Sequence, residues 1–502
     1  MPGVVVSTAV RTGPSSATVR ESSQLFVVGM AERGPSDEAV LVESLADFEY
    51  KFGGFQSYSY LHPTLEAFFE EGGTQAYVSR VVGPAATTGL KNLQGIASAS
   101  ATTVMTLDAT GPGSWSSNIG VWVSHPTANT NFKITLYYDG VAVYNTGTCT
   151  SLTQAAGRIN TSTIATRYVT ATVASGQTSI PATLGTSGAP SAFTAGNDDR
   201  SNVGDTELTD GLELFNDALG AGAVAIVDGT ENTASAASFP LSEALITHAN
   251  EYNRVAILHA GQNETNADAI AKAADLQNLE HAEHAALYHP WVDVPTDVAG
   301  VTRRIPPTGY VAAKRALAHN QTGPHVAPAG LISVSKFATG VASDINKTDG
   351  DALDDAGVNA IRIIQNSVRI YGARSLSTDE DNFRYITTQD IVNTVVVDSK
   401  RTLEDLVFSV IDGRDTIFAA VTARLIAVLA PLRDSGALFQ AFDANGKKVD
   451  SGFTVRCDAS LNPVSQLAGG TVKAKVGIRT SSVGDKIEVD IVKSNLTATV
   501  VQ

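Results

Sequence analysis

Two clusters of residues in this sequence have the side chains that metal sites use. The first, Glu280–His284 followed by His289, offers carboxylates and imidazoles of the kind that bind zinc. It lacks the HExxH order, and no third ligand lies at motif spacing. We therefore expect no metal here: His281 and His284, three residues apart, are expected to share a solvated polar face of a helix.

The second cluster is acidic and suggests calcium. Five aspartates and Asn346 lie between Asp344 and Asp355. The register of an EF-hand loop is not met, because Gly350 is out of place and no glutamate closes the loop. A solvated acidic loop is the better interpretation.

Motifs for catalysis or cofactor binding are not found. The sequence contains no Walker glycine loop, no nucleophile-elbow serine and no dinucleotide fingerprint after a strand. Cys149 and Cys457, the two cysteines, are too few for a disulfide framework or a metal cluster, and we expect two buried or half-buried free thiols. We predict no catalytic residues, no cofactor and no metal.

Composition narrows the class of protein further. The chain has 502 residues, of which 43% are hydrophobic, so it can bury a large core. A net charge of −16 argues against nucleic acid or an anionic membrane as the main partner. We see no signal peptide and no apolar stretch of about 20 residues, so we expect a soluble product made in the cytoplasm.

The elements around these clusters alternate between strands and helices. Residues 23–85 and 206–371 contain short apolar strands between helical segments, which predicts a mostly parallel sheet covered on both faces. A helix over Tyr310–His319 lies between two proline-rich turns that fix its ends. The predicted strands are Leu25–Met30, Ala76–Val82, Ala223–Val227, Val255–His259, Ala285–Tyr288, Val358–Ile364 and Val368–Ala373.

Residues 86–205 differ from the flanking chain. Thr, Ser, Ala and Gly dominate, helical periodicity fades, and short β-rich segments appear. Asp139-Gly140 between two alternating runs is a strong hairpin signal. We predict a small β-rich domain inserted into the α/β chain.

The C-terminal part combines helix and strand. Thr402 with Asp405 predicts the start of a long amphipathic helix that bends at Gly413. Phe453–Cys457, Thr471–Ile478 and Lys486–Val492 are expected to be strands. Each end of the chain, residues 1–22 and 494–502, is a β-prone arm with no local strand to pair with.

A set of short motifs occurs in one order along the chain. The central motif is Pro306–Ala312, ending at Ala327–Ala329. The other motifs are Pro2–Val6, Val28-Gly29, Arg33–Pro35, Phe52–Gly54, Phe68-Phe69, Gly72-Gly73, Ala76–Val78, Arg80-Val81, Gly357–Arg362, Tyr371–Ser377, Gly436–Leu438 and Val455–Asp458. With these motifs, over most of its length outside the β-rich insertion, the chain resembles the tail sheath proteins of contractile phages and related contractile injection systems. Tyr371 stands where a tryptophan is common in that family.

The resemblance implies a fold and a function. It implies a subtilisin-like α/β layer over 206–371 without proteolysis, an outward-facing insertion over 86–205, and a C-terminal α+β sheath domain over 372–493. Such proteins stack as hexameric rings around a tail tube and contract to drive it through a cell envelope. The expected partners are further copies of the chain, the tube protein, and baseplate and tail terminator or neck proteins, in a virion tail assembled in the host cytoplasm. A hydrolase-like enzyme and a static shell or adhesin protein are the alternatives.

The expected contact residues between subunits follow from strand addition, in which an extended arm joins a neighbour's exposed sheet edge. The arm residues are Val4, Val5, Val6, Leu496, Val500 and Val501. The residues on the acceptor strands are Val472, Val476, Ile478, Ile487, Val489 and Ile491.

Overall fold

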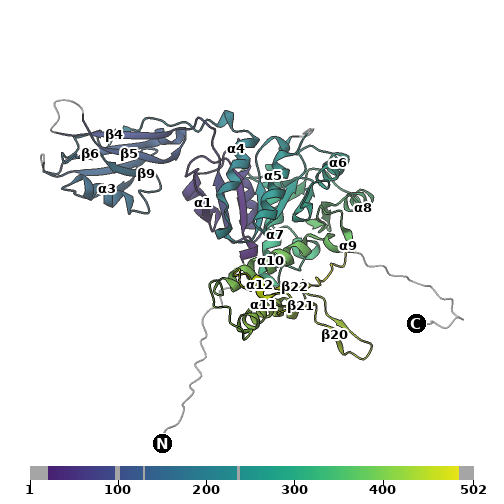
Figure 1. Ribbon diagram of the computed structural model, residues 1–502. Helices are drawn as coiled ribbons and strands as arrows, with labels where there is room; N and C mark the ends of the chain where they lie inside the picture. Colours follow the sequence, from purple (N-terminus) through teal and green to yellow (C-terminus); the bar gives the residue numbers. More distant parts are fainter. Residues whose placement is uncertain (1–20, 97–101, 128–129, 234–237, 486–502) are drawn as a thin grey trace, which may run out of the picture. The chain divides into compact units, whose positions relative to one another are not determined.

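A computed structural model describes residues 21–96, 102–127, 130–233 and 238–485 of the chain. The chain forms two compact units. The first unit comprises Met1–Pro324 and Pro328–Asp398, and the second comprises His325–Ala327 and Ser399–Gln502. The first unit holds an α/β sheet and the β-rich insertion, and the second holds the C-terminal helices and small sheets (Figure 1).

An eight-stranded sheet is the centre of the first unit, in the order β18-β17-β13-β12-β11-β1-β3-β2. The six inner strands pair in parallel, and β2 and β18 close the two edges in antiparallel pairs. This confirms the predicted mostly parallel sheet. The strands are β1 (Leu25–Gly29), β2 (Val40–Val42), β3 (Ala76–Arg80), β11 (Ala223–Ile226), β12 (Val255–His259), β13 (Ala285–His289), β17 (Val358–Ile364) and β18 (Ser367–Tyr371).

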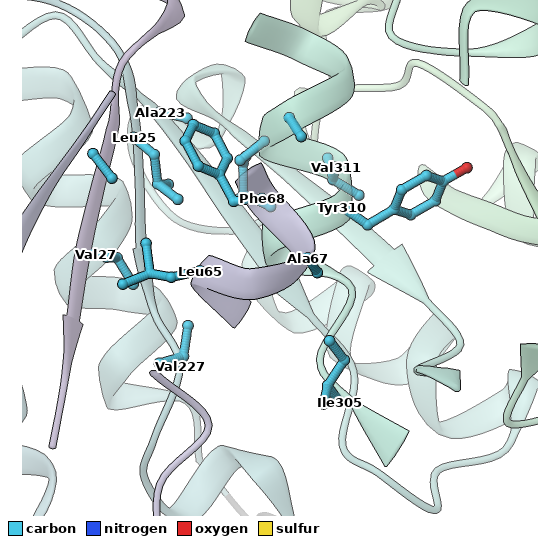
Figure 2. Packing of buried hydrophobic residues seen from close by; sticks show 14 of the residues in the cluster. Leu25, Val27, Leu65, Ala67, Phe68, Ala223, Val227, Ile305, Tyr310 and Val311 are labelled. Carbon is cyan, nitrogen blue, oxygen red and sulfur yellow. The ribbon is translucent and has the colours of Figure 1, made fainter. Parts of the chain in front are cut away.

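Both faces of this sheet are buried against helices. Alternate residues of β1 point to opposite sides, so Leu25 and Val27 join one core while Phe26 and Val28 join the other. Figure 2 shows the first core, where Phe68 and Val311 pack beside β1. The first core is covered by α1 (Leu45–Phe52), α2 (Leu61–Glu70) and α7 (Thr308–Gln321), and the second by α4 (Asp205–Asp210), α5 (Pro240–Glu251), α6 (Asn266–Leu276) and α8 (Lys347–Asp355).

The helix starts follow local capping chemistry. Ser44 caps α1 by accepting a hydrogen bond from the Asp47 amide. The prediction of an acidic loop around Asp349 is wrong. This segment forms the helix α8, and the side chain of Asn346 caps its start by accepting a hydrogen bond from the Asp349 amide. Asparagine and aspartate are common both in calcium loops and at helix starts, so the composition of this segment alone does not distinguish the two.

The insertion is β-rich, as predicted. It contains a four-stranded sheet in the order β10-β6-β7-β8 and a three-stranded sheet in the order β4-β5-β9. Asp139 and Gly140, both at positive φ, form the turn of the β7–β8 hairpin. The elements are β4 (Thr88–Gln94), β5 (Thr103–Pro112), β6 (Ile119–Ser124), β7 (Lys133–Tyr138), β8 (Val141–Asn145), α3 (Leu152–Asn160), β9 (Val169–Val173) and β10 (Ser191–Ala192).

A buried arginine joins the insertion to the sheet. The Arg80 guanidinium donates to the carbonyl oxygens of Ala31 at 3.1 Å, Gly34 at 2.8 Å and Pro112 at 3.0 Å. Burial lowers the pKa of Arg80 to about 10. The main chains also touch, because a Cβ on Gly111 would lie 2.0 Å from the Gly34 carbonyl oxygen.

The second unit is built on helix α11 (Thr416–Asp434), whose buried residues pack with those of a small sheet. The prediction that a helix starts at Thr402 is wrong. Helix α10 runs over Ile386–Glu404, and the break between it and α11 contains Gly413. α11 is apolar and long enough to cross a membrane by length and composition alone, with a third of its apolar window buried. The other strands and helices of this unit among the described residues are β19 (Ala441–Phe442), β20 (Lys448–Asp450), β21 (Phe453–Arg456), α12 (Val464–Leu467) and β22 (Lys475–Ile478). The first unit further contains β14 (Val292–Pro295), β15 (Thr302–Ile305), β16 (Gly340–Val341) and α9 (Glu380–Phe383).

Candidate assembly interface

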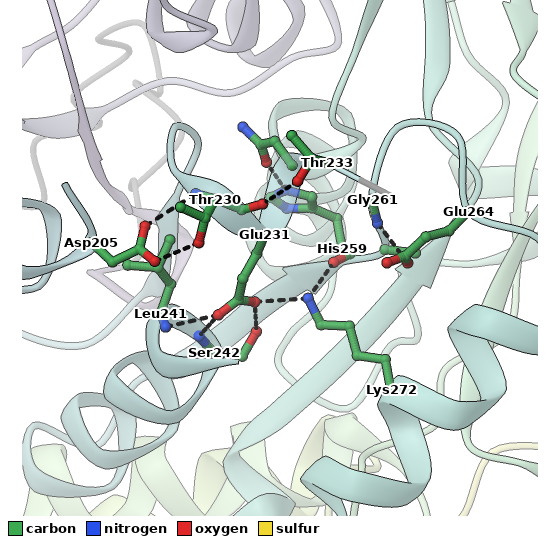
Figure 3. Close-up of polar contacts among 12 residues, drawn as sticks. Asp205, Thr230, Glu231, Thr233, Leu241, Ser242, His259, Gly261, Glu264 and Lys272 are labelled. Carbon is green, nitrogen blue, oxygen red and sulfur yellow. Dashed lines mark hydrogen bonds and ion pairs between the residues drawn. The ribbon is translucent and has the colours of Figure 1, made fainter. Parts of the chain in front are cut away.

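The carboxyl edge of the parallel sheet, where open α/β sheets usually bind ligands, carries several polar groups. Glu231 lies there, buried, and accepts the amides of Leu241 at 2.8 Å and Ser242 at 3.0 Å (Figure 3). These are first-turn amides of α5, whose N-cap residue gives no side-chain cap. Glu231 therefore supplies the cap that this helix lacks.

The other groups at this edge also bond to each other. Lys272 donates to Glu231 at 2.8 Å and to the His259 carbonyl oxygen at 3.0 Å. His259 Nε2 lies 2.7 Å from Asn232 Oδ1, and its Nδ1 lies 3.3 Å from the Thr308 hydroxyl. The cavity that remains is about 10 Å³, which is the space of one water molecule. This network holds the fold together and leaves no room for a substrate.

The histidines of the sequence cluster are not brought together as ligands. His281 has a left-handed backbone and is half exposed, with its ring 3.6 Å from Glu283. His284 is buried, and its ring nitrogens lie 3.1 Å from the Arg254 carbonyl oxygen and 2.9 Å from the Gln389 amide nitrogen. The predicted solvated helix face is therefore wrong for His284. Among the residues that the structure describes, no group of three His, Cys, Asp or Glu side chains could hold a metal.

Cysteine chemistry agrees with the prediction. Cys149 is buried and Cys457 half-buried, and both are free thiols. Burial raises the pKa of Cys457, and the neighbouring Asp458 raises it further, so the reactive thiolate form is disfavoured.

The predicted acceptor strand, β22 (Lys475–Ile478), has one paired edge and one open edge among the described residues. β22 pairs antiparallel with β21, with Gly477 opposite Thr454 and Val476 opposite Val455. The Arg479 amide donates to Gly452 and its carbonyl accepts from Phe439, so residue 479 faces the β21 side. Because main-chain groups alternate along a strand, those of Val476 and Ile478 face the opposite edge. Among the described residues nothing pairs with that edge.

Three predicted acceptor residues can be placed. Val476 lies in β22 with its side chain against the core around α11, and Ile478 is half-buried at the end of β22. Val472 packs on the same core but precedes the strand, which is shorter than predicted. Asn462 causes this, because it bonds both the amide and the carbonyl of Lys473 at 2.6 Å and 2.8 Å.

The remaining site predictions lie outside the described residues. These are the arm residues Val4, Val5, Val6, Leu496, Val500 and Val501 and the acceptor residues Ile487, Val489 and Ile491.

Exposed apolar side chains are frequent in the second unit, and sequence reasoning did not single them out. Phe408 is fully exposed and has a φ of 66°, which is rare for a bulky residue. The missed signal was the mostly apolar segment Val407–Ile411 directly before Asp412-Gly413, which periodicity assigned to a helix face. The exposed large apolar residues of this unit are Val407, Phe408, Val410, Ile426, Phe439, Phe442, Val449 and Val464.

The complete fold, with a parallel α/β sheet, a β-rich insertion and a helix-and-sheet C-terminal unit, is that of contractile-sheath proteins. A sheath tail protein from Listeria innocua matches with a TM-score of 0.60 and 15% identity, over 87% of this chain and 89% of that one. The sheath of an extracellular contractile injection system, PVC, in its contracted state matches with a TM-score of 0.55 and 15% identity, over 98% of both chains.

A third solved structure matches over an equal length. The contracted helical sheath of the anti-feeding prophage has a TM-score of 0.54 and 14% identity, over 98% of this chain and 99% of that one. No protein-family model and no curated protein matches the sequence. The likeness is thus one of fold, and it extends through both units and the insertion.

Proposed function

We propose that this chain is the subunit of a contractile sheath, which polymerises around a tail tube and contracts to drive the tube through a target envelope. The observation that carries the proposal is the fold correspondence over nearly the whole length of chains that assemble as sheaths. A match of one domain would fit many functions, but a match that includes the insertion and the C-terminal unit fits few.

The open edge of β22 supplies the contact between copies. An arm of a neighbouring subunit would add there as a strand, using the main-chain groups of Val476 and Ile478. Each added hydrogen bond contributes about 0.5–1.5 kcal/mol. Several weak bonds between extended chains let neighbouring subunits shift while staying connected, which a contracting lattice requires.

The finer architecture belongs to the same proposal. Residues 206–371 form the subtilisin-like layer without proteolysis, 86–205 face outward, and 372–493 form the sheath domain, with arms over 1–22 and 494–502. The subunits stack as hexameric rings. The partners are the tube, the baseplate and the neck or terminator proteins, and the particle is assembled in a host cytoplasm. The saturated polar network at Glu231 supports a role without catalysis.

Electron microscopy of the purified full chain tests the proposal. Striated hollow cylinders are expected from the natural chain. Deletion of residues 1–12 should leave a folded, soluble monomer that forms no cylinders, because the strand that adds to a neighbour is lost. Normal sheaths from this deletion would contradict the role of the arm, and monomers from the natural chain under all conditions would contradict the sheath function.

A paired substitution tests the acceptor edge. Ile478→Pro removes an outward amide but no β21 hydrogen bond, so the chain should fold and assemble at least tenfold less efficiently, for the loss of about 1.4 kcal/mol per contact. Ile478→Ala is the control, because it also shortens the side chain but keeps the amide. Equal assembly of both variants in a sedimentation assay would place the contact elsewhere.

A further inference from the structure

One buried arginine contacts two distant parts of the first unit. Arg315 lies in the middle of α7 and is almost fully buried. Its Nε donates to both carboxylate oxygens of Asp390 at 3.2 Å, and its Nη2 donates to Oδ1 of the same residue. Its Nη1 donates to the main-chain carbonyl of Ser22 at 2.6 Å. A single guanidinium thus uses three nitrogens on two partners.

A histidine one turn further along α7 contacts the same two residues. His319 Nδ1 lies 3.1 Å from the Ser22 hydroxyl, and its Nε2 lies 3.3 Å from Asp390 Oδ2. Both partners are therefore held by two side chains from one helix. Burial alone would raise the pKa of Asp390, but Arg315 and His319 lower it below the usual value, so the carboxylate stays ionised at neutral pH.

The two partners of Arg315 and His319 lie in distant parts of the chain. Ser22 belongs to the turn Glu21–Ser23 and is the last residue of the segment predicted to be the N-terminal arm, residues 1–22. Asp390 lies in the first turns of α10, whose last residues, from Ser399 on, belong to the second unit. Ser22, at the base of the arm, and Asp390, near the start of α10, therefore share one buried contact with Arg315.

We propose that Arg315 is a positioning residue that couples the base of the N-terminal arm to helix α10. Release of either partner from Arg315 loosens the other, so assembly through the arm depends on the contact that Ser22 at its base shares with α10. The consequence for assembly rests on the proposed sheath function, whereas the coupling itself does not.

The neighbouring residue provides a matched control. Lys314 is equally buried on α7 and forms an ion pair with Glu71 at 2.7 Å. Glu71 also accepts the amides of Lys336, Phe337 and Ala338. This pair joins α7 to α2 and to residues 335–338 and touches neither Ser22 nor α10. Its loss removes the same kind of interaction without the proposed coupling.

Hydrogen exchange on the unassembled full-length chain tests the coupling. In the double variant Arg315→Met/Asp390→Leu, which replaces the pair by apolar groups of similar size, amides of residues 22–25 and 391–395 should both exchange about tenfold faster or more. The matched variant Lys314→Met/Glu71→Gln, in which the glutamine oxygen can still accept the amides of residues 336–338, should leave both segments unchanged. Loosening of one segment alone, or equal loosening of both in the control, would overturn the proposal.

A conservative variant separates coupling from simple loss of stability. Lysine at position 315 has one ammonium group, so Arg315→Lys can pair with Asp390 but cannot hold Ser22 in the same geometry. Exchange should then rise at 22–25 and, because the two are coupled, more weakly at 391–395. If the double variant does not fold, Asp390→Asn replaces it, since it keeps an acceptor and the volume, and the same two segments should loosen together.

Assembly is measured separately by sedimentation. Failure of the natural chain to form sheaths would contradict the proposed function and leave the exchange result standing. Normal assembly by an Arg315 variant whose two segments have loosened would contradict the positioning role alone.

Discussion

The eight-stranded sheet of the first unit and the two-stranded sheet of the second differ in how completely they are covered. Helices bury both faces of the large sheet, and antiparallel strands end it at both edges. The β21–β22 sheet has one face on α11, and among the described residues its β22 edge has no partner. The large sheet is buried on both faces, whereas among the described residues the β22 edge of the small sheet is open to a further strand.

The two parts of the chain also differ in their balance of basic and acidic residues. Residues 1–398 contain 22 Lys and Arg against 40 Asp and Glu, whereas residues 399–502 contain 13 against 11. Strong like charge keeps surfaces apart, and a near-neutral surface with exposed apolar side chains favours association. Under the proposed function, this contrast favours the second unit as the part that contacts other copies of the chain.

Removal of a buried charge should give the largest difference in stability cost between the two units. Glu71→Ala leaves Lys314 buried without its carboxylate, at a cost of about 3–5 kcal/mol. Protection of β11 and β12 amides from hydrogen exchange should fall accordingly, with α11 unaffected. In the second unit, Asp405→Ala removes an exposed pair with Arg424 and should cost no more than about 1 kcal/mol. Similar costs for the two substitutions would contradict the contrast.

Mild acid should also act on the first unit alone. Burial is the largest cause that lowers the pKa of His248 and His259 to about 3 and of His289 to about 4. The unfolded chain binds these protons near pH 6.5 and the folded chain does not, so stability is complete above pH 6.5 and falls as the pH decreases toward 4. Each histidine contributes up to about 1.4 kcal/mol per pH unit.

The second unit contains His325 but no histidine in residues 399–502, so α11 and the small sheets of that unit provide an internal control. Between pH 7 and 5.5, hydrogen exchange corrected for intrinsic rates should show loss of protection in β12 and none in α11. His248→Phe should make the pH dependence of the first unit shallower. A parallel loss in α11 would mean that the two units unfold together.

The smallest expected effect concerns Phe408. Its left-handed backbone costs about 1 kcal/mol for any residue with a side chain, and no burial of the ring compensates. Phe408→Gly should therefore stabilise the second unit by about 0.5–1 kcal/mol in urea unfolding. Phe442→Gly, in the strand β19, should destabilise it by a similar amount. Loss of stability in both variants would show that Phe408 is packed in solution.

Much of the sheet could be predicted because its strands are short and buried on both faces. Val255–His259 and Val358–Ile364 match β12 and β17 residue for residue, since a run of β-branched and apolar residues between turns has few other stable conformations. The buried α7 follows from its flanking prolines. These features depend on local chemistry alone.

Features that depend on distant residues could not be predicted. Thr402 and Asp405 have the pattern of a helix start, yet Thr402 lies in the last turn of α10, because the preceding turns of that helix are held by Arg315 and Gln389 contacts in the first unit. His284 is three residues from His281 but is buried by α10. The free edge of β22 depends on which groups face β21, and that requires the register.

The three carbonyl bonds of Arg80 have a consequence for domain exchange. The guanidinium is satisfied only when Ala31 and Gly34 of the core and Pro112 of the insertion are all in place. An insertion taken from another protein would leave a buried donor unpaired unless its chain returned a carbonyl to the position of Pro112. The boundary at residue 86 is therefore a poor place to cut this gene, and keeping residues 80–112 alone does not repair it, because β5 pairs with β9 beyond residue 112.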